Sequence, residues 1–80
     1  MSPENKILSA TEKARRLNEG HVYLKNEFQG CVMKHLPGES PYWYCKFKGK
    51  PEYEIHHSTN LVTDTYLEWN EITAKEYREF

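Results

Sequence analysis

The chain has 80 residues, of which 38% are hydrophobic, and its formal net charge is −1 at pH 7. A chain of this length has room for one hydrophobic core, so we expect a single domain over residues 1–80. Six Tyr and two Trp supply large rings for that core, and the near-zero charge is not typical of a disordered chain. The small net charge also argues against a protein that binds polyanions by bulk electrostatics.

The sequence gives no sign of a membrane segment or a secretory signal. No apolar run approaches the ~18 residues that a membrane-spanning helix needs, and the start MSPENK is polar. Cys31 and Cys45 are too few for a disulfide scaffold, so we interpret them as reduced thiols in a cytoplasmic protein. The Cys and His residues lack the paired spacing of structural zinc sites, and we expect no metal and no cofactor.

Residues 7–20, ILSATEKARRLNEG, predict the first helix. Ser9 and Glu12 have the spacing of a capping box, and Gly20 stands where a left-handed residue commonly ends a helix. One apolar stripe recurs at helical spacing and consists of Ile7, Ala10, Ala14 and Leu17. Three basic residues lie off this stripe and are expected on the solvated face: Lys13, Arg15 and Arg16.

After Gly20 the apolar pattern changes to a period of two, which is typical of strands. The segments rich in β-branched and aromatic residues are 21–25, 30–36, 42–48, 53–57 and 61–69. Turn residues separate them, among them Pro37 and Gly38, which suit the centre of a type II turn. The intervals are too short for crossover helices, so we expect an antiparallel meander of four to five strands. A small SH3-like, partly closed barrel is the alternative.

The end of the chain predicts a short second helix. Thr73 and Glu76 have capping-box spacing, with Tyr77 at the fourth helical position. A helix of barely two turns is weak alone, so Tyr77 and Phe80 are expected to dock and to cover an end of the sheet. The expected fold class is therefore α+β: an N-terminal helix, an antiparallel meander sheet and a short C-terminal helix.

Alternation along residues 42–48 separates two faces of the third expected strand. One face is apolar and holds Trp43, Cys45 and Phe47. The other face mixes aromatic and basic side chains and holds Tyr42, Tyr44, Lys46 and Lys48. We expect the first face to belong to the core and the second to point outward.

The loop after this strand decides how residues 53–57 pair with it. A two-residue turn would bury Glu52 and Glu54 among apolar side chains, which costs several kcal/mol. We therefore predict an odd-length loop with three inner pairs: Phe47–Tyr53, Cys45–Ile55 and Trp43–His57. The same register predicts two outer ion pairs, namely Lys48–Glu52 and Lys46–Glu54.

The same reasoning places the strand at 30–36 on the other side. A five-residue loop at 37–41 predicts three inner pairs: Cys31–Phe47, Met33–Cys45 and His35–Trp43. In the alternative register Val32, Lys34 and Leu36 face inward, which places a lysine at the centre of the core. We prefer the first register for this reason.

The sequence favours a binding protein over an enzyme. It contains no nucleophile elbow, P-loop or dinucleotide motif, and a short meander offers little concavity for a substrate. We expect a small protein-binding module that docks on a larger protein or enzyme, of the phage or bacterial accessory or inhibitor type. Residues 51–80 carry seven acidic against two basic side chains and would suit a basic groove. The candidate surface consists of Tyr42, Tyr44, Lys46, Lys48, Glu68 and Glu71.

Two other hypotheses stay open at this point. The first is binding of single-stranded RNA or DNA on the outer sheet face, with Tyr42 and Tyr44 stacking on bases. Its phosphate contacts would come from Lys25, Lys34, Lys46 and Lys48. The second is a homodimer formed through an unpaired strand edge, at residues 21–25 or 61–69.

Overall fold

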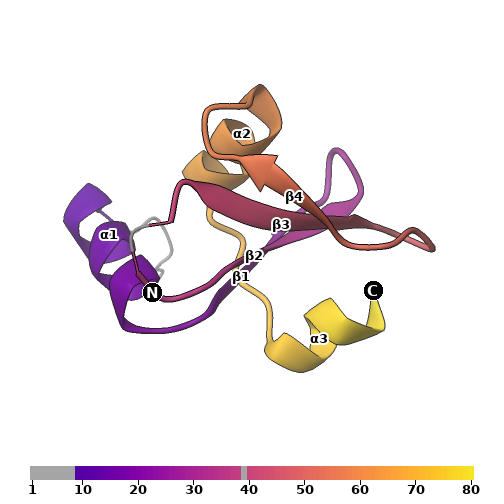
Figure 1. Cartoon of the computed structure of the whole chain (residues 1–80), viewed down its shortest axis with the longest axis horizontal. Coiled ribbons are helices and arrows are strands. Elements are labelled where there is room, and N and C mark those ends of the chain that lie inside the picture. Colours follow the sequence, from indigo (N-terminus) through magenta and orange to yellow (C-terminus); the bar gives the residue numbers. More distant parts are fainter. Residues whose placement is uncertain (1–8, 39) are drawn as a thin grey trace, which may run out of the picture.

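The structure, a computed structural model, describes residues 9–38 and 40–80. Its antiparallel sheet has the order β1-β2-β3-β4 and consists of β1 (Val22–Asn26), β2 (Cys31–His35), β3 (Tyr42–Phe47) and β4 (Tyr53–His56). The helices of the described ranges are α1 (Ala10–Glu19), α2 (Asn60–Glu68) and α3 (Ala74–Glu79). Figure 1 shows α2 and α3 on opposite faces of the sheet and α1 beside one end. The α+β prediction is confirmed, and the sheet is open rather than a barrel.

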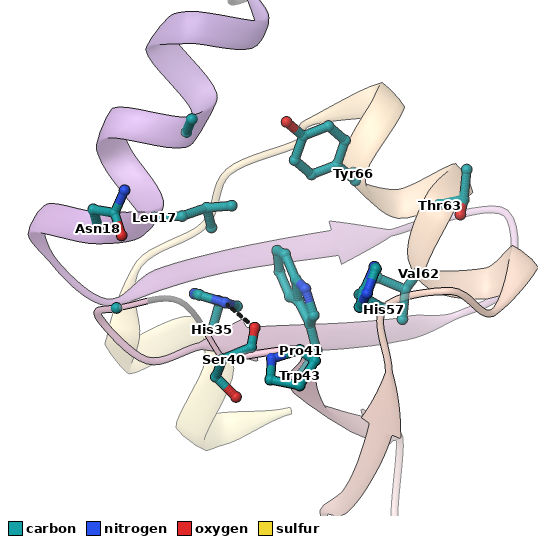
Figure 2. A pocket seen from close by; sticks show the side chains of 12 residues that line it. Leu17, Asn18, His35, Ser40, Pro41, Trp43, His57, Val62, Thr63 and Tyr66 are labelled. Atoms are coloured by element: carbon teal, nitrogen blue, oxygen red, sulfur yellow. Dashed lines mark hydrogen bonds between the residues drawn. The ribbon is translucent and has the colours of Figure 1, made fainter.

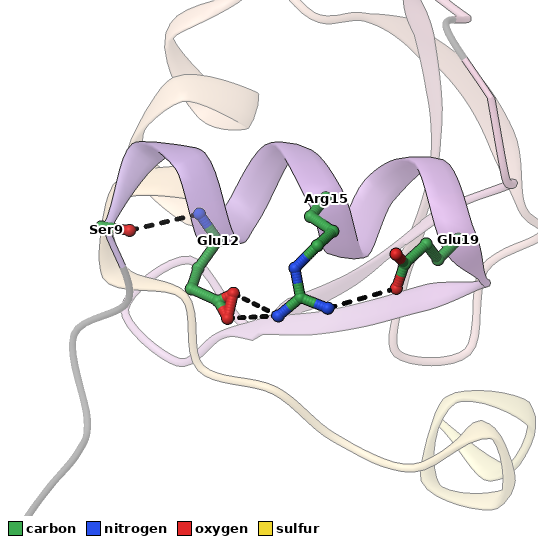
Figure 3. A network of polar contacts seen from close by, with 4 residues as sticks. All are labelled: Ser9, Glu12, Arg15 and Glu19. Atoms are coloured by element: carbon green, nitrogen blue, oxygen red, sulfur yellow. Dashed lines mark hydrogen bonds and ion pairs between the residues drawn. The ribbon is translucent and has the colours of Figure 1, made fainter.

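Helix α1 is capped by Ser9 as predicted, but the Glu12 half of the expected capping box is not formed and the helix ends differently from the prediction. The Ser9 hydroxyl accepts a hydrogen bond from the Glu12 amide at 3.2 Å, whereas the Glu12 carboxylate pairs with Arg15, which also reaches Glu19 (Figure 3). Ile7, part of the expected stripe, lies outside the described residues. Gly20 has φ −167° and is extended, so the expectation of a left-handed residue is wrong. The chain extends at once because β1 begins two residues later.

Lys13 is the clearest departure from the expected solvated face of α1. Only 5% of the residue is exposed, and its ammonium group donates to the Tyr66 carbonyl at 3.1 Å and the Leu67 carbonyl at 3.5 Å. It also lies 4.8 Å from the Tyr66 ring centre. Carbonyls in the last turn of a helix lack partners within the helix, so Lys13 caps the C-terminal end of α2 and joins the two helices.

The prediction of a strand at residues 61–69 is wrong, because this segment forms α2. Thr59 caps the helix by accepting from the Val62 amide, and Trp69 ends it with φ 48°. The buried and half-buried side chains of this segment fit a helical stripe, which consists of Leu61, Val62, Thr65, Tyr66 and Trp69. Burial of this stripe against the sheet outweighs the strand preference of Val and Thr.

The sheet register confirms the predicted faces and corrects one set of partners. Met33 lies opposite Cys45, as predicted. On the other side Cys45 lies opposite Tyr53 and Trp43 opposite Ile55, so β4 is displaced by two residues from the predicted pairing. The parity of the loop is right, and the inner face is unchanged. The error arises because the chain turns one residue earlier than predicted: the Lys50 amide donates to the Phe47 carbonyl at 2.9 Å, and Gly49 has φ 76°.

The two predicted outer ion pairs are also wrong. Glu52 does not pair with Lys48. It forms an ion pair with Lys34 at 3.2 Å and accepts a hydrogen bond from the Tyr77 hydroxyl. The predicted pairing of Lys46 with Glu54 fails because the shifted register places Tyr44 opposite Glu54.

The inner face of the sheet forms the core together with α2. The buried apolar cluster consists of Val22, Leu24, Cys31, Met33, Trp43, Cys45, Val62 and Trp69. Cys31 and Cys45 are free thiols with no exposed surface. A hydrogen bond that the Cys31 thiol donates to Cys45, together with burial, raises the pKa of Cys31. With no surface in water, the two cysteines pack as small side chains in the core.

The opposite face of the sheet is covered by α3. Its capping box of Thr73 and Glu76 is confirmed, and Tyr77 is 4% exposed. The Tyr77 ring lies 5.5 Å from the Lys34 ammonium group and 4.8 Å from that of Lys46. Burial and the hydrogen bond to Glu52 raise the pKa of Tyr77. Helix α3 therefore covers this face, and not an end of the sheet as expected, because its tyrosine binds between the lysines.

We predict that Lys13→Met lowers the free energy of unfolding by about 2 kcal/mol, because it leaves two carbonyls of α2 without their charged donor. Methionine keeps the length of the apolar stem. Lys75→Met, at an exposed position of α3, is the control and should change the value by less than about 0.5 kcal/mol. Urea unfolding measures both variants. Equal stability of Lys13→Met and the wild type would contradict the role given to Lys13.

We predict that Glu52→Gln lowers stability at pH 7 by roughly 0.5–1 kcal/mol, a value reduced by solvent screening. The Tyr77 hydroxyl, and then Lys34, lower the pKa of Glu52 from its ordinary value of 4.5. The contribution is therefore complete above that value and is lost as the pH falls through the lowered pKa. Unfolding of both proteins between about pH 7 and pH 2 should show the difference shrinking in acid. Glu54→Gln is the control. A loss of stability for Glu52→Gln that does not change with pH, or that is at every pH no larger than the loss for Glu54→Gln, would refute this assignment.

Candidate functional site

The structure divides the surface that the sequence predicts. Lys46 donates to the Arg78 carbonyl at 3.3 Å, and Lys48 lies 5.7 Å from the Phe80 ring centre. Tyr44 lies beside Lys34, with 5.2 Å between its ring centre and the ammonium group. Tyr42 is exposed at the start of β3 and contacts the His56 ring. Three of these four side chains therefore lie against α3 or a lysine, and Tyr42 lies apart.

The two predicted acidic residues lie elsewhere. Glu71 pairs with Arg16 of α1 and accepts from the Trp69 indole at 3.3 Å. Glu68 stands in the last turn of α2 and lines a shallow cleft beside Leu67. The six residues of the predicted surface thus do not form one patch. Glu68 belongs instead to a different surface, the cleft beside Leu67.

The strand edges also differ from those expected. Residues 70–72 pair with β1: the Lys25 amide donates to the Asn70 carbonyl at 2.8 Å, and the Ile72 amide to the Tyr23 carbonyl at 2.9 Å. The segment at 61–69 is helical, so neither expected edge is open. In the described part of the chain the free edge of the sheet is β4.

Asn26 fixes the turn between β1 and β2. Its side-chain carbonyl accepts from the Gln29 amide at 2.9 Å, and its backbone carbonyl accepts from the Gly30 amide at 2.8 Å. Gly30 has φ 73°, a conformation that glycine adopts without strain. The Asn26 side-chain amide donates to the buried Thr65 hydroxyl at 2.9 Å. These bonds hold the turn at a fixed position beside α2.

The turn presents Phe28 to solvent next to Leu67 of α2. Phe28 is 89% exposed and Leu67 is 63% exposed. Both line a cleft of about 260 Å³ that Asn26 and Gln29 also border. Two large apolar side chains on a rigid frame, with most of their area in water, are typical of an interaction surface.

Acidic side chains surround these two apolar groups. Asp64 and Glu68 line the same cleft from α2, and Glu27 precedes Phe28 in the turn and is exposed. None of the described residues that line the cleft is a lysine or arginine. We name Glu27, Phe28, Asp64, Leu67 and Glu68 the turn–helix patch. It is an apolar centre with a negative rim.

Sequence reasoning missed Phe28 and Leu67, although one signal was present. Phe28 lies in the segment NEFQG, between two strands and among turn residues, where an aromatic side chain has no place in the core. Leu67 was hidden by the strand interpretation of residues 61–69. On a helix it lies off the buried stripe of Val62, Thr65 and Trp69.

The part of the chain that the structure describes contains neither a cluster of metal ligands nor a membrane-spanning helix. These residues contain no group of three or more His, Cys, Asp or Glu side chains placed to hold a metal ion. Among the helices of residues 9–38 and 40–80, none is both long and apolar enough to cross a lipid bilayer. Comparison of the chain with known protein families, curated proteins and solved structures found no significant match.

We predict that Phe28→Ala and Leu67→Ala each change the free energy of unfolding by less than about 0.5 kcal/mol, because both side chains already lie in water. Leu24→Ala, which removes a fully buried leucine, is the comparison and should cost about 2–5 kcal/mol. Chemical unfolding of the three variants tests the distinction. A large loss for Phe28→Ala would show that this ring packs in the fold and is not free for a partner.

Proposed function

We propose that this protein is a small non-enzymatic binding module that docks on a larger protein through the turn–helix patch. The observation that carries the proposal is the exposure of Phe28 and Leu67 side by side. Aromatic and leucine side chains in water lower the free energy when a partner covers them. Because the Asn26 bonds already fix the turn, little conformational entropy is lost on binding.

The charge around the patch defines the partner. Asp64 and Glu68 on α2 and Glu27 in the turn carry like charge, which favours a protein with an apolar pocket bordered by lysine or arginine. Such complementary charge raises the association rate and makes binding sensitive to salt. The sequence analysis expected acidic residues of the last third of the chain to contact the partner. In this proposal those residues are Asp64 and Glu68 of α2, and Glu68 was also part of the predicted surface.

The nucleic-acid hypothesis has less support. The lysines that it requires lie near the aromatic rings of α3 or beside Tyr44, as the ring distances of Lys25, Lys34, Lys46 and Lys48 show. Phosphate binding would have to compete with these contacts and with Glu52. An accessory or inhibitor role of phage or bacterial type, and a cytoplasmic location, belong to this proposal as the sequence predicts them.

The test is an affinity capture with the immobilised full chain, after nuclease treatment of the lysate. We expect the wild type to retain a stoichiometric protein partner. The double variant Phe28→Ala/Leu67→Ala should bind that partner at least about tenfold less tightly, as is usual when central residues of an interface are removed. Tyr53→Ala, at an exposed position of β4, is the matched control and should bind normally. Affinity of the purified pair is then measured at several salt concentrations.

Two results would oppose the proposal. One is the absence of any stoichiometric protein across those salt conditions. The other is a partner that binds Phe28→Ala/Leu67→Ala as tightly as the wild type, which would place the interface elsewhere. Asp64→Lys/Glu68→Lys should weaken the complex and reverse its salt dependence if the acidic rim contributes.

A further inference from the structure

A cavity of about 500 Å³ lies between α1, α2 and the inner face of the sheet. Figure 2 shows Trp43 at its centre, His35 on one side, Val62 on the other, and Leu17 and Tyr66 across from the sheet. Its volume falls within the range of about 300–1,000 Å³ that small-molecule sites occupy. It is separate from the turn–helix patch, which lies on another side of α2.

The walls of the cavity are aromatic and aliphatic. Trp43 is 3% exposed, and the rings of Trp43 and Tyr66 together with the side chains of Leu17 and Val62 provide the apolar surface. Among the described residues that line it, none is Asp, Glu, Lys or Arg. A charged ligand would lose its hydration without gaining a counter-charge from these described residues, and their aromatic and aliphatic surface suits a ring.

His35 supplies a buried acceptor in the wall. The hydrogen bond from Nε2 to the Ser40 carbonyl, at 3.3 Å, requires that Nε2 carries the proton, because a carbonyl only accepts. Nδ1 is then an acceptor, and it has no hydrogen-bond partner among the described residues. The residue is 3% exposed, and burial lowers the pKa of the imidazole and keeps it neutral. An unpaired buried acceptor is unfavourable, and a donor from a ligand would relieve it.

We propose that this cavity binds a small uncharged aromatic compound of the phenol class, whose hydroxyl donates to His35 Nδ1. Its ring lies between Trp43 and Tyr66. Nδ1 has no exposed surface, so the hydroxyl reaches it only after neighbouring side chains move apart. The Trp43 ring centre lies 4.8 Å from that of His35, so a ligand bound to His35 changes the surroundings of the indole. The Trp43 indole N–H signal in an NMR spectrum therefore reports binding.

The experiment titrates the full chain with p-cresol, toluene and 4-methylbenzoate, followed by NMR and calorimetry. These probes share one ring and one methyl group and differ in the donor and the charge. We expect saturable binding of p-cresol with a shift of the Trp43 indole signal, and binding of the other two at least about tenfold weaker. Equal affinity for toluene, or no saturable binding of p-cresol, would overturn the proposal.

Two variants locate the site. His35→Leu removes the acceptor and should reduce p-cresol affinity to that of toluene, whereas His21→Leu, at an exposed histidine outside the cavity, should leave it unchanged. Ala14→Phe fills the cavity from an exposed position of α1 and should abolish the binding of p-cresol and of toluene. This variant is the test if His35→Leu does not fold. Undiminished p-cresol binding by the Ala14→Phe protein would place the ligand elsewhere and refute the assignment.

Discussion

Two buried polar contacts hold α2 against the rest of the protein, and both surfaces described above depend on them. At one end Lys13 donates to the carbonyls of Tyr66 and Leu67. In the middle Asn26 donates to Thr65, whose hydroxyl also donates to the Leu61 carbonyl. Each contact satisfies groups that would otherwise be buried without partners, and this makes their loss costly. With α2 fixed in this way, Val62 and Tyr66 form a wall of the cavity and Leu67 lies beside Phe28.

The distribution of charge follows from the same arrangement. The basic middle of the chain lies mainly on the sheet face that α3 covers, where Lys34 and Lys46 are positioned around Tyr77 and Lys34 also pairs with Glu52. These two lysines therefore already have partners within the protein. The acidic side chains of α2 face water next to the exposed apolar groups. A nearly neutral protein therefore carries a local cluster of acidic side chains beside these apolar groups, and the basic partner that we propose rests on this cluster.

Local rules in the sequence were sufficient for part of this fold. The caps at Ser9 and Thr73 were predictable because a hydroxyl three residues before a glutamate has a defined partner. The inner faces of β2 and β3 were predictable because alternation leaves only one register without a buried lysine. The displacement of β4 was not predictable, since alternation fixes only whether the loop is odd or even and not at which residue the chain turns.

The candidate site was less predictable than the fold. Glu68 was predicted from its charge. The position of Phe28 next to α2 could not be predicted, because it depends on the hydrogen bonds by which Asn26 fixes the turn beside that helix. Lys13 was expected in water because it lies off the apolar stripe of its helix, and only the position of α2 gives it partners. Val62 and Thr65 favour strands locally, while their burial requires a helix. In each case a contact between distant segments outweighs the local preference.

The turn–helix patch and the cavity both depend on the position of α2, and solution NMR of the labelled full chain measures that position. We expect helical Cα shifts for residues 60–68 and a nuclear Overhauser effect between the Lys13 side chain and the Tyr66 ring. Extended shifts in this segment, with cross-strand effects to β1 or β4, would contradict it and would remove the basis for both the turn–helix patch and the cavity.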